Sequence, residues 1–574
     1  MAYMPKAKPG MNKAAGAHGG GLRGDQVNRG SRIFEGRFGR MFRSLPAAEF
    51  EDAKLEILAR EMSADPEHVL DSPSKPAAAP ETPDKIQDGE ENTGISAGYT
   101  YLGQFIDHDI TFDPASSLQK RNDPDGLIDF RTPALDLDCL YGRGPDDQPY
   151  MFDADGRKFI LGDGLTETVG GPIKAYDLPR LGERHRAVIG DKRNDENVIV
   201  SQLQGIFLRF HNRLADDHKD LSFAEIQRKV RWHYQYVVLH DYLPKIVGEA
   251  TMNKIWSGRK HGNTCGNEPN LCFYHFHDDA YMPIEFAMAA YRFGHSMVRP
   301  IYRLNTQHTA AGQGDDASLN GRFFIFAGVQ ERGLNGFGQF PRHWAIDWSL
   351  FFDINDSGTQ GRTARVQPAY KIDTSLVNPL AFLPEFSQNP KPAGTPLIIG
   401  VPGTTDPVGT LQSVEKSHQS PNNLAIRNLW RGNSMGLPSG QDVAKAMGEI
   451  PLTDDELWVG KAQLDERGKV DAKKIREIAG GHFANKAPLW YYVLAEANDQ
   501  WVKAIGDKTG DAANHVPVTL GAVGGTIVAE TLIGLMLADS HSFLNQDPRW
   551  QPEVPCSKKG VFTMGDFIKY ALKI

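Results

Sequence analysis

Residues 103–109, of sequence GQFIDHD, place one histidine between two carboxylates. If this segment is helical, Gln104, Asp107 and His108 stand at i, i+3 and i+4 and share one face. Asp109 then points about 100° away from His108, which is the angular step of one helical residue. One face could therefore move protons in a reaction while Asp109 serves a second site on the other face. A surface helix with an acidic start would carry the same residues, so later segments decide between these interpretations.

Three later segments repeat this spacing of polar residues beside apolar helical patterns. The pairs, each three residues apart, are Arg193 with Glu196, Arg292 with His295, and Asn428 with Arg431. Gly294 precedes His295 and weakens a helix, so it indicates close approach of something flat to the backbone. Four polar pairs of this kind predict one buried polar ligand.

The same segments carry a resemblance to a known family. Five blocks, in order along the chain, resemble the animal-type haem peroxidases of the peroxidase–cyclooxygenase superfamily, in particular bacterial members: residues 101–114, 132–142, 190–215, 285–300 and 424–440. The resemblance implies a mainly α fold, in which one large helical domain surrounds a buried haem and has few short strands. The apolar periodicity from residue 98 onward is mostly helical, which agrees with this expectation.

The resemblance implies a role around the haem for five of these residues. His295 would bind the iron, and Asn428 would accept the ring N–H of that histidine and so set its tautomer. His108 would move a proton between the two oxygens of peroxide, and Arg193 would stabilise the charge that develops as they separate. Gln104 could hydrogen-bond water or a halide beside them. Taken alone, a histidine such as His295 would more often be a satisfied core residue.

Two carboxylates and two arginines would hold the haem itself. Asp107 and Glu196 stand where family members form ester bonds to haem methyl groups, so haem b with two covalent links is expected. Asn197 stands where myeloperoxidase has the methionine of a third link, which should be absent here. Arg292 and Arg431 would pair with the propionates, although either could form a structural salt bridge instead.

Residues 132–138, of sequence TPALDLD, resemble the calcium loop of the family. Ca²⁺ takes roughly six to eight oxygen ligands from carboxylates, hydroxyls and carbonyls. The expected ligands are the carboxylates of Asp109, Asp136 and Asp138, the oxygens of Thr132 and the carbonyl of Ala134. An Asp-rich surface turn is the alternative. Because Asp109 follows His108 directly, a bound ion would stiffen the backbone that aims this histidine.

Three functions compete. The resemblance favours a haem-dependent peroxidase that uses hydrogen peroxide to oxidise halides, thiocyanate or small organic donors. A fatty-acid oxygenase of the same superfamily needs a radical-forming tyrosine, and Arg342 fills the place where cyclooxygenases carry it before a His-Trp pair. The third possibility is a non-catalytic adhesion protein similar to peroxinectin. Intact His108, Arg193 and His295 argue against that loss of activity.

Composition narrows the class of protein. The chain has 574 residues, of which 40% are hydrophobic and 24% charged, and a net charge of −9. These values are typical of a globular protein without general affinity for nucleic acid or anionic lipid. No apolar leader is visible, and the most apolar late stretch, residues 526–538, carries Glu530 and is too short for a bilayer. We therefore expect no transmembrane segment, and either a cytoplasmic protein or one secreted by a leaderless route.

The chain divides into four expected parts. Residues 1–31 form a disordered Gly-rich tail, and residues 32–97 form an N-terminal extension and linker that is partly helical. Residues 98–545 form the catalytic domain, and residues 546–574 form a C-terminal extension. Residues 368–423, rich in Pro and Gly, are expected to be a long irregular excursion from the domain.

The cysteines exclude an architecture built on disulfides. Only four occur, namely Cys139, Cys265, Cys272 and Cys556. Cys265 and Cys272 could close one small loop, but their spacing matches no zinc motif, so free buried thiols are expected.

Overall fold

The structure is a computed structural model that describes residues 36–63, 89–112, 128–165, 174–256, 269–276, 279–305, 322–326, 333–354, 366–381, 383, 422–555 and 561–574. Its α-helices are α1 (Asp52–Glu61), α3 (Ala97–Ile110), α4 (Asp138–Tyr141), α5 (Val198–Asp217), α6 (Phe223–Val237), α7 (Leu243–Trp256), α8 (Ile284–Ala287), α9 (Asn378–Ala381), α11 (Leu424–Ser434), α12 (Gly440–Ala446), α13 (Leu489–Ile505), α14 (Asp511–Asn514), α15 (Ala522–Ala538), α16 (Phe543–Gln546) and α17 (Met564–Leu572).

Shorter elements connect these helices. The 3₁₀ turns are η4 (Pro149–Met151), η5 (Lys192–Asp195), η7 (Ala290–His295), η9 (Arg342–Trp344), η10 (Trp348–Leu350), η12 (Ile475–Glu477) and η13 (Ala479–Gly481), and η6 (Val238–Tyr242) is a π-helical turn. The strands are β1 (Gly36–Gly39), β2 (Glu91–Ser96), β3 (Ile128–Asp129), β4 (Arg180–Leu181), β5 (Arg186–Ala187), β6 (Met282–Pro283), β7 (Ile301–Arg303), β8 (Arg322–Phe324), β9 (Pro368–Tyr370), β10 (Trp458–Leu464) and β11 (Val470–Lys474).

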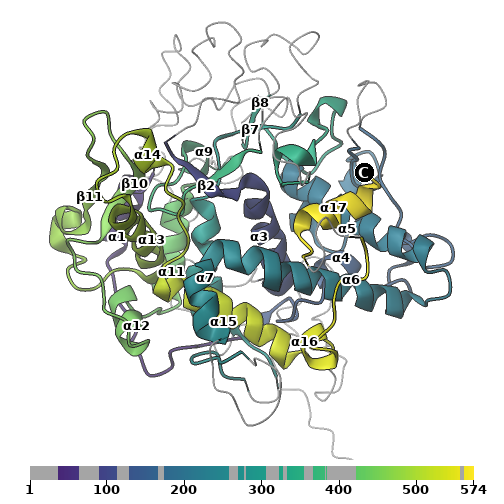
Figure 1. Ribbon diagram of the computed structural model, residues 1–574, viewed down its shortest axis with the longest axis horizontal. Coiled ribbons are helices and arrows are strands. Elements are labelled where there is room, and N and C mark those ends of the chain that lie inside the picture. Colours follow the sequence, from purple (N-terminus) through teal and green to yellow (C-terminus); the bar gives the residue numbers. More distant parts are fainter. Residues whose placement is uncertain are drawn as a thin grey trace, which may run out of the picture.

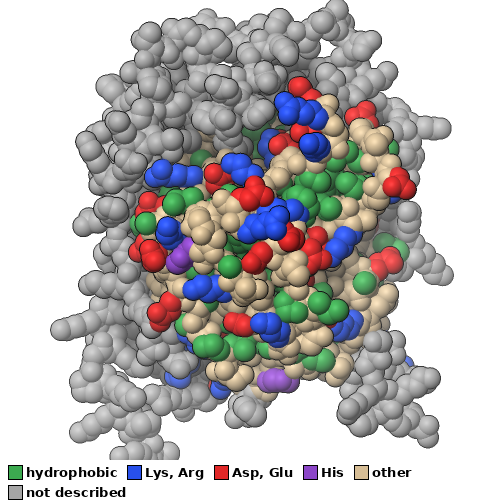
Figure 2. Space-filling model, turned by 90° about the vertical axis from the view of Figure 1, so that its left-hand side faces the viewer, with side chains coloured by type: hydrophobic (Ala, Val, Ile, Leu, Met, Phe, Trp, Pro, Cys, Tyr) green, Lys and Arg blue, Asp and Glu red, His purple; other side chains and the backbone are tan. Residues whose placement is uncertain are grey.

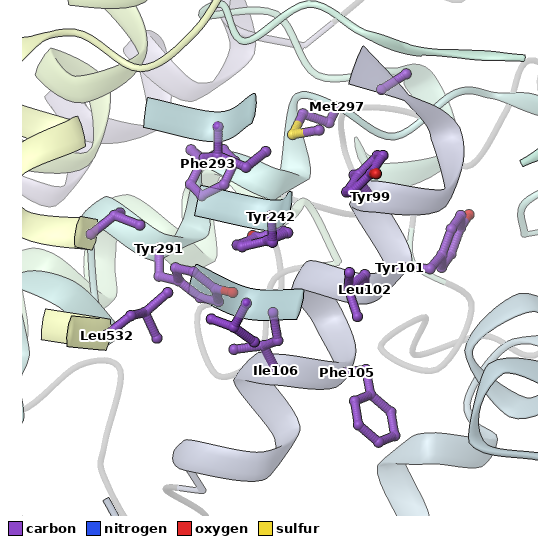
Figure 3. Close-up of a cluster of buried hydrophobic side chains, with 14 of the residues drawn as sticks. Tyr99, Tyr101, Leu102, Phe105, Ile106, Tyr242, Tyr291, Phe293, Met297 and Leu532 are labelled. Carbon is purple, nitrogen blue, oxygen red and sulfur yellow. The ribbon is translucent and has the colours of Figure 1, made fainter. Parts of the chain in front are cut away.

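Helix α3 crosses the middle of the molecule (Figure 1). In that view α5, α6 and α17 gather on one side of it, and α1, α11, α12 and α13 on the other. Along α3 every residue is buried except Gln104 and Asp107. Ile106 of α3 lies near Tyr291 of η7 (Figure 3), whereas the ring of Phe105 stacks on Phe207 of α5 with centroids 4.2 Å apart. The central helix is therefore held on nearly all sides, and its two part-exposed residues share one face.

The close contact between α3 and η6 depends on a glycine. A Cβ atom at Gly103 would lie 2.6 Å from the hydroxyl oxygen of Tyr242, so a larger residue would push this side chain away. Helices α6 and α7 join through η6 without a loop. The π-helical turn thus brings Tyr242 against the turn of α3 that begins the GQFIDHD segment.

Helix α5 begins at a strong cap. The side-chain oxygen of Asn197 accepts from the backbone N–H groups of Ile199 and Val200 at 3.1 and 2.9 Å. Such a cap stabilises a helix start by about 1 kcal/mol. Further along α5, the ring of Phe210 stacks on Phe567 of α17 with centroids 3.7 Å apart.

The strands are short and pair locally. β10 and β11 form an antiparallel hairpin, β2 pairs antiparallel with β9, and β1 lies between β3 and β6. Most of the described core consists of helices instead. The expected mainly α fold with few short strands is therefore confirmed.

Both ends of the described chain pack on the helical core. β1 pairs with β6, and α1 packs on α11. At the other end, α17 packs on α5. The proposed extensions at residues 32–97 and 546–574 thus contribute side chains to the same core, while the tail at residues 1–31 lies outside the described residues. Most of the excursion expected at residues 368–423 also lies outside them.

Among the described helices, none combines the length and the apolar character needed to cross a bilayer. α15 is buried over most of its length, as expected for a core helix. Basic and acidic side chains are interspersed on the face that Figure 2 shows. Cys139 is buried, but Cys272 is exposed, so the expected burial is wrong for Cys272, which lies in a bend outside the helices and strands; Cys265 and Cys556 lie outside the described residues.

Candidate functional site

Three elements bring the polar pairs of the sequence together. α3 packs against both η5 and η7. Six polar residues that the sequence analysis selected are part-exposed on these three elements or directly after η5: Gln104, Asp107, Arg193, Glu196, Arg292 and His295. A Cβ atom at Gly294 would meet no atom of the described residues within 4 Å. Space for a ligand therefore lies beside η7, next to His295.

His108 is a buried imidazole whose tautomer follows from its partner. Its Nδ1 lies 2.7 Å from Oδ1 of Asn194. Asn194 is itself oriented by donation from its Nδ2 to Oε1 of Gln204 at 2.8 Å. An amide oxygen can only accept, so Nδ1 carries the proton and Nε2 keeps a lone pair. Nε2 lies 3.9 Å from Oε1 of Glu196, a carboxylate that lines the same site.

The surroundings of His108 keep it neutral. Burial lowers its pKa, the positive charge of Arg193 lowers it further, and the resulting value is about 3. A neutral imidazole with a free Nε2 is a base, whereas an imidazolium is not. His108 is therefore in the form that can accept a proton at neutral pH.

Arg193 is fixed beside His108 by three contacts. Its Nη2 donates to the backbone carbonyl of His108 at 2.9 Å and to the carboxylate of Asp191 at 2.8 Å. Its guanidinium lies over the ring of Phe112, 4.4 Å from the centroid. These contacts place a permanent positive charge beside the histidine, and they keep the pKa of Asp191 well below its usual range despite burial.

Asp138, Arg131, Asp191 and Arg193 form a charge network. It runs from Arg193 to the Asp-rich loop, residues 132–138. Arg131 donates from Nε to Asp191 at 3.0 Å, and its Nη1 lies 3.4 Å from Oδ1 of Asp138. Charges alternate in sign along the network, so each group stabilises its neighbours.

Gln104 holds Glu196 in the site. Its Nε2 donates to Oε1 of Glu196, and its Oε1 accepts from Nδ2 of Asn197 at 3.1 Å. Asp107, three residues along α3, accepts at Oδ1 from the hydroxyl of Thr111 at 3.1 Å. Burial raises the pKa of Asp107. The two carboxylates expected to link a haem thus lie on neighbouring elements that line the same site.

His295 lies on η7 and contacts Asn428 of α11. Nδ2 of Asn428 lies 2.7 Å from Nδ1 of His295, while Oδ1 of Asn428 accepts from Nη1 of Arg292 at 3.1 Å. Burial, with a smaller effect from Arg292, lowers the pKa of His295 to about 3. The expected contact between Asn428 and His295 is present, but the amide nitrogen of Asn428 faces the ring instead of its oxygen. The reason is that the amide oxygen accepts from Arg292. Arg431, one turn further on α11, is part-exposed.

The Asp-rich loop gathers three carboxylates. One oxygen from each of Asp109, Asp136 and Asp138 lies within 4.8 Å of the others. Oδ2 of Asp109 accepts from the N–H of Leu137 at 3.2 Å, whereas its Oδ1 is buried and accepts no hydrogen bond from the described residues. Burial, and next the charge of Asp136, raise the pKa of Asp109 to about 7. Three close carboxylates with a buried free oxygen fit a hard cation such as Ca²⁺.

The remaining loop residues shape this cluster. The N–H and hydroxyl of Thr132 lie 3.3 and 3.4 Å from Oδ2 of Asp138, and the carbonyl of Thr132 accepts from Ala134 at 2.7 Å. Leu137 has a positive φ of 59°, an uncommon conformation for a branched residue. This backbone turn aims the carboxylates before and after it inward.

Four residues of the site were missed by sequence reasoning. They are Asn194, Gln204, Asp191 and Arg131. Asp191 and Asn194 flank Arg193 in the sequence, so their position was a usable signal. Arg131 and Gln204 reach the site only through tertiary contacts, and no local pattern marks them.

Comparison with known proteins finds sequence similarity over part of the chain. A family model for the animal haem peroxidase matches residues 124–342. The human peroxidasin homolog is 26% identical over 231 residues, which cover 37% of this chain and 15% of that protein. Thyroid peroxidase of the dog, Canis lupus familiaris, is 27% identical over 248 residues, covering 39% of this chain and 24% of that protein. The match therefore spans less than a quarter of the length of these relatives.

A solved structure shows the same fold over nearly the whole chain. Peroxidase A from Dictyostelium discoideum aligns with a TM-score of 0.52 at 13% identity, covering 92% of this chain and 93% of that one. The family match, the sequence relatives and this fold agree with one another. Residues 124–342 thus resemble the animal haem peroxidases in sequence, and nearly the whole chain shares the fold of Peroxidase A.

Proposed function

We propose that this protein is a haem-dependent peroxidase that uses hydrogen peroxide to oxidise small electron donors. The observation that carries the proposal is a neutral histidine, His108, with its Nε2 free in a site that also contains His295. A haem bound there would supply an iron centre that peroxide oxidises by two electrons. The residues of the chain bind that group, orient peroxide and move its proton.

Six residues suit the binding of a haem. His295 would hold the haem iron, since it follows Gly294, beside which there is open space. Asp107 and Glu196 would supply the carboxylates for two ester links to the haem. Arg292 and Arg431 would pair with the propionates by charge-assisted hydrogen bonds. Arg292 would then release Asn428, whose amide could turn and accept from Nδ1 of His295.

The proton moves through His108 alone. Its Nε2 takes the proton from one oxygen of peroxide and returns it to the other as the O–O bond breaks. Asn194 keeps Nδ1 protonated throughout, because its amide oxygen faces that atom at 2.7 Å. Arg193 provides fixed positive charge where negative charge develops. Gln104 would hydrogen-bond the water or halide beside them.

A calcium ion is the second proposed cofactor. Asp109, Asp136 and Asp138 supply carboxylates, and Thr132 and Ala134 would add hydroxyl and carbonyl oxygens. Because Asp109 is adjacent to His108 on α3, the ion would fix the helix end that carries the base. Calcium would therefore act on the geometry of the site rather than on the reaction itself.

The fatty-acid oxygenase alternative has less support from the sequence. Arg342 stands at the place expected for a radical-forming tyrosine, and this side chain is exposed on η9. The adhesion alternative does not explain why His108, Arg193 and His295 converge. Halide, thiocyanate and small phenols remain candidate donors for the peroxidase.

The test uses full-length protein loaded with haem and mixed rapidly with hydrogen peroxide. His108→Ala should keep bound haem but react with peroxide about 10²–10⁴-fold more slowly, the range of general acid–base catalysis. His295→Ala should lose the spectrum of histidine-ligated haem. His541→Ala, at a histidine whose side chain is 71% exposed, serves as the control and should match the parent protein. A near-normal rate in His108→Ala would overturn the assignment.

A further inference from the structure

A pocket of about 420 Å³ opens outside the site that contains His108 and His295. Its walls come from three segments, and the lining residues are Tyr150, 160–165, 177–181, His185, Val188, Gln339, Phe340 and Arg342. None of the residues proposed above to bind haem or calcium lines it. Pockets of this size commonly bind small organic molecules.

The walls of the pocket are tied together at its base. Asp177 accepts from Nε of Arg180 at 2.9 Å and from the N–H of Phe340 at 3.0 Å. A Cβ atom at Gly162 would lie 2.2 Å from the carbonyl oxygen of Asp177, so two walls touch backbone to backbone. The pocket is therefore held open by hydrogen bonds and packing, not by a flexible loop.

The rim of the pocket is unusually apolar for a surface. Tyr150, Ile160 and Leu181 line it and are 56%, 43% and 62% exposed. They are among the few large apolar side chains exposed in the described part of the chain. Phe337, near the third wall, is 55% exposed as well. Clustered exposed apolar groups mark binding surfaces.

The charges at the pocket disfavour an anionic ligand. Arg180 donates to two carboxylates, from Nε to Asp177 at 2.9 Å and from Nη1 to Asp195 at 2.8 Å. Two carboxylates thus share one guanidinium, and the lining of the pocket carries as many carboxylates (Asp163 and Asp177) as guanidiniums (Arg180 and Arg342). Since positive charge does not prevail, halide and thiocyanate find little attraction here. An uncharged ring suits the apolar rim better.

Two structural links join the pocket to the candidate haem site. Arg180 at the pocket base holds Asp195, and the next residue, Glu196, lines the haem site. The ring of Phe340 lies 5.7 Å from that of buried Trp344, whose carbonyl accepts from Gln202 of α5 at 2.7 Å. A ring bound in the pocket would thus begin an aromatic series that leads toward α5.

We propose that this pocket binds an uncharged phenol or similar aromatic molecule as the electron donor. The inference rests on the proposed peroxidase function and names the substrate class for it. Two phenols each lose one electron and one proton and leave as phenoxyl radicals. One hydrogen peroxide gains these two electrons and two protons, its O–O bond breaks, and two waters form.

The experiment measures binding and turnover separately on haem-loaded, full-length protein. Binding of 4-ethylphenol is measured by equilibrium dialysis without peroxide. Leu181→Asp should weaken this binding about tenfold, because it replaces an apolar contact with a charge. The KM for 4-ethylphenol should rise by the same factor, while the KM for peroxide and the oxidation of iodide stay unchanged. Ile450→Asp, at a residue that is 92% exposed and outside the pocket, is the matched control and should leave both values as in the parent.

Ile160→Asn tests the same rim without adding a charge and should also weaken the binding of 4-ethylphenol. Binding that neither variant changes would overturn the proposal, as would weaker binding with an unchanged KM. Failure of the peroxidase function itself would look different. In that case no donor, iodide included, would be oxidised, whereas the dialysis result would stand independently.

Discussion

At the scale of single residues, Asn194 decides which nitrogen of His108 can act as a base. Asn194→Leu would leave the Nδ1–H of His108 buried without its acceptor, which costs about 1–3 kcal/mol and frees the ring to change tautomer. We expect the reaction with peroxide to slow by roughly 10–100-fold, as for other partners that orient a histidine. Stopped-flow measurement checks this, and Asn270→Leu at an exposed position is the control. An unchanged rate would show that the tautomer is set elsewhere.

The pH dependence of the same step follows from the pKa of His108. The base acts only when neutral, and its pKa is lowered to about 3, so the rate should stay constant below neutral pH and decline only near pH 3. Asn194→Asp would place a carboxylate at Nδ1, stabilise the imidazolium and raise this pKa. The decline should then begin at a higher pH. A profile that does not move would contradict the proposed contact.

Asp107 and Glu196 support a third prediction at this scale. After several turnovers with peroxide, haem should stay with the protein during acid–organic extraction, since ester bonds survive it. The double variant Asp107→Val, Glu196→Leu should release the haem, as measured by absorbance of the organic phase. Glu466→Leu with Asp511→Val, at two exposed acidic residues, is the matched control. Complete release from the parent protein would disprove the ester links.

At the scale of elements, the Asp-rich loop and α3 form one unit. Asp109→Ala should bind less calcium, melt at a lower temperature and react more slowly with peroxide, although His108 and Arg193 remain. The reason is that Asp109 contributes a buried oxygen to the cluster and follows His108 directly. Calcium content, melting temperature and stopped flow check the three effects. The site would be refuted if the parent protein contained no calcium and its melting temperature did not change with a strong chelator.

The pKa of Asp109 adds a pH dependence with a defined sign. In the absence of calcium its pKa is raised to about 7, above the unfolded value of about 3.9. Folding then favours the protonated form, so this contribution to stability is present below about pH 4 and is lost as the pH rises through 7. Calcium competes with that proton. The rise in melting temperature on adding calcium should therefore be larger at pH 8 than at pH 5.5.

Local patterns predicted the elements and the residues within them, but not every partner. The i, i+3 and i+4 spacing placed Gln104, Asp107 and His108 on one face of a helix, because helical geometry alone determines this. Arg131 and Gln204 escaped notice, since their roles arise from contacts across many residues of chain. Which amide atom of Asn428 faces His295 also depends on a neighbour, Arg292, and no local spacing reveals this neighbour.

At the scale of the whole molecule, the C-terminal helix is part of the core. The ring of Phe567 stacks on Phe210, and both are fully buried. Phe567→Ala should destabilise the protein by about 3–5 kcal/mol, the usual cost of emptying a buried aromatic site. Thermal melting and protease resistance check this, with Val561→Ala at a 47% exposed residue as the control. Unchanged melting would mean that α17 packs loosely in solution.

The charge network has an evolutionary consequence. Asp191 is bonded to both Arg131 and Arg193, and its side chain is only 2% exposed. Losing Asp191 alone would leave two guanidiniums without their shared partner, at a cost of about 3–5 kcal/mol for a broken buried pair. A neutral replacement is tolerable only when its neighbours change as well. Among relatives, these four positions should therefore covary, and an ancestor could cross between charged and neutral versions only through a destabilised intermediate.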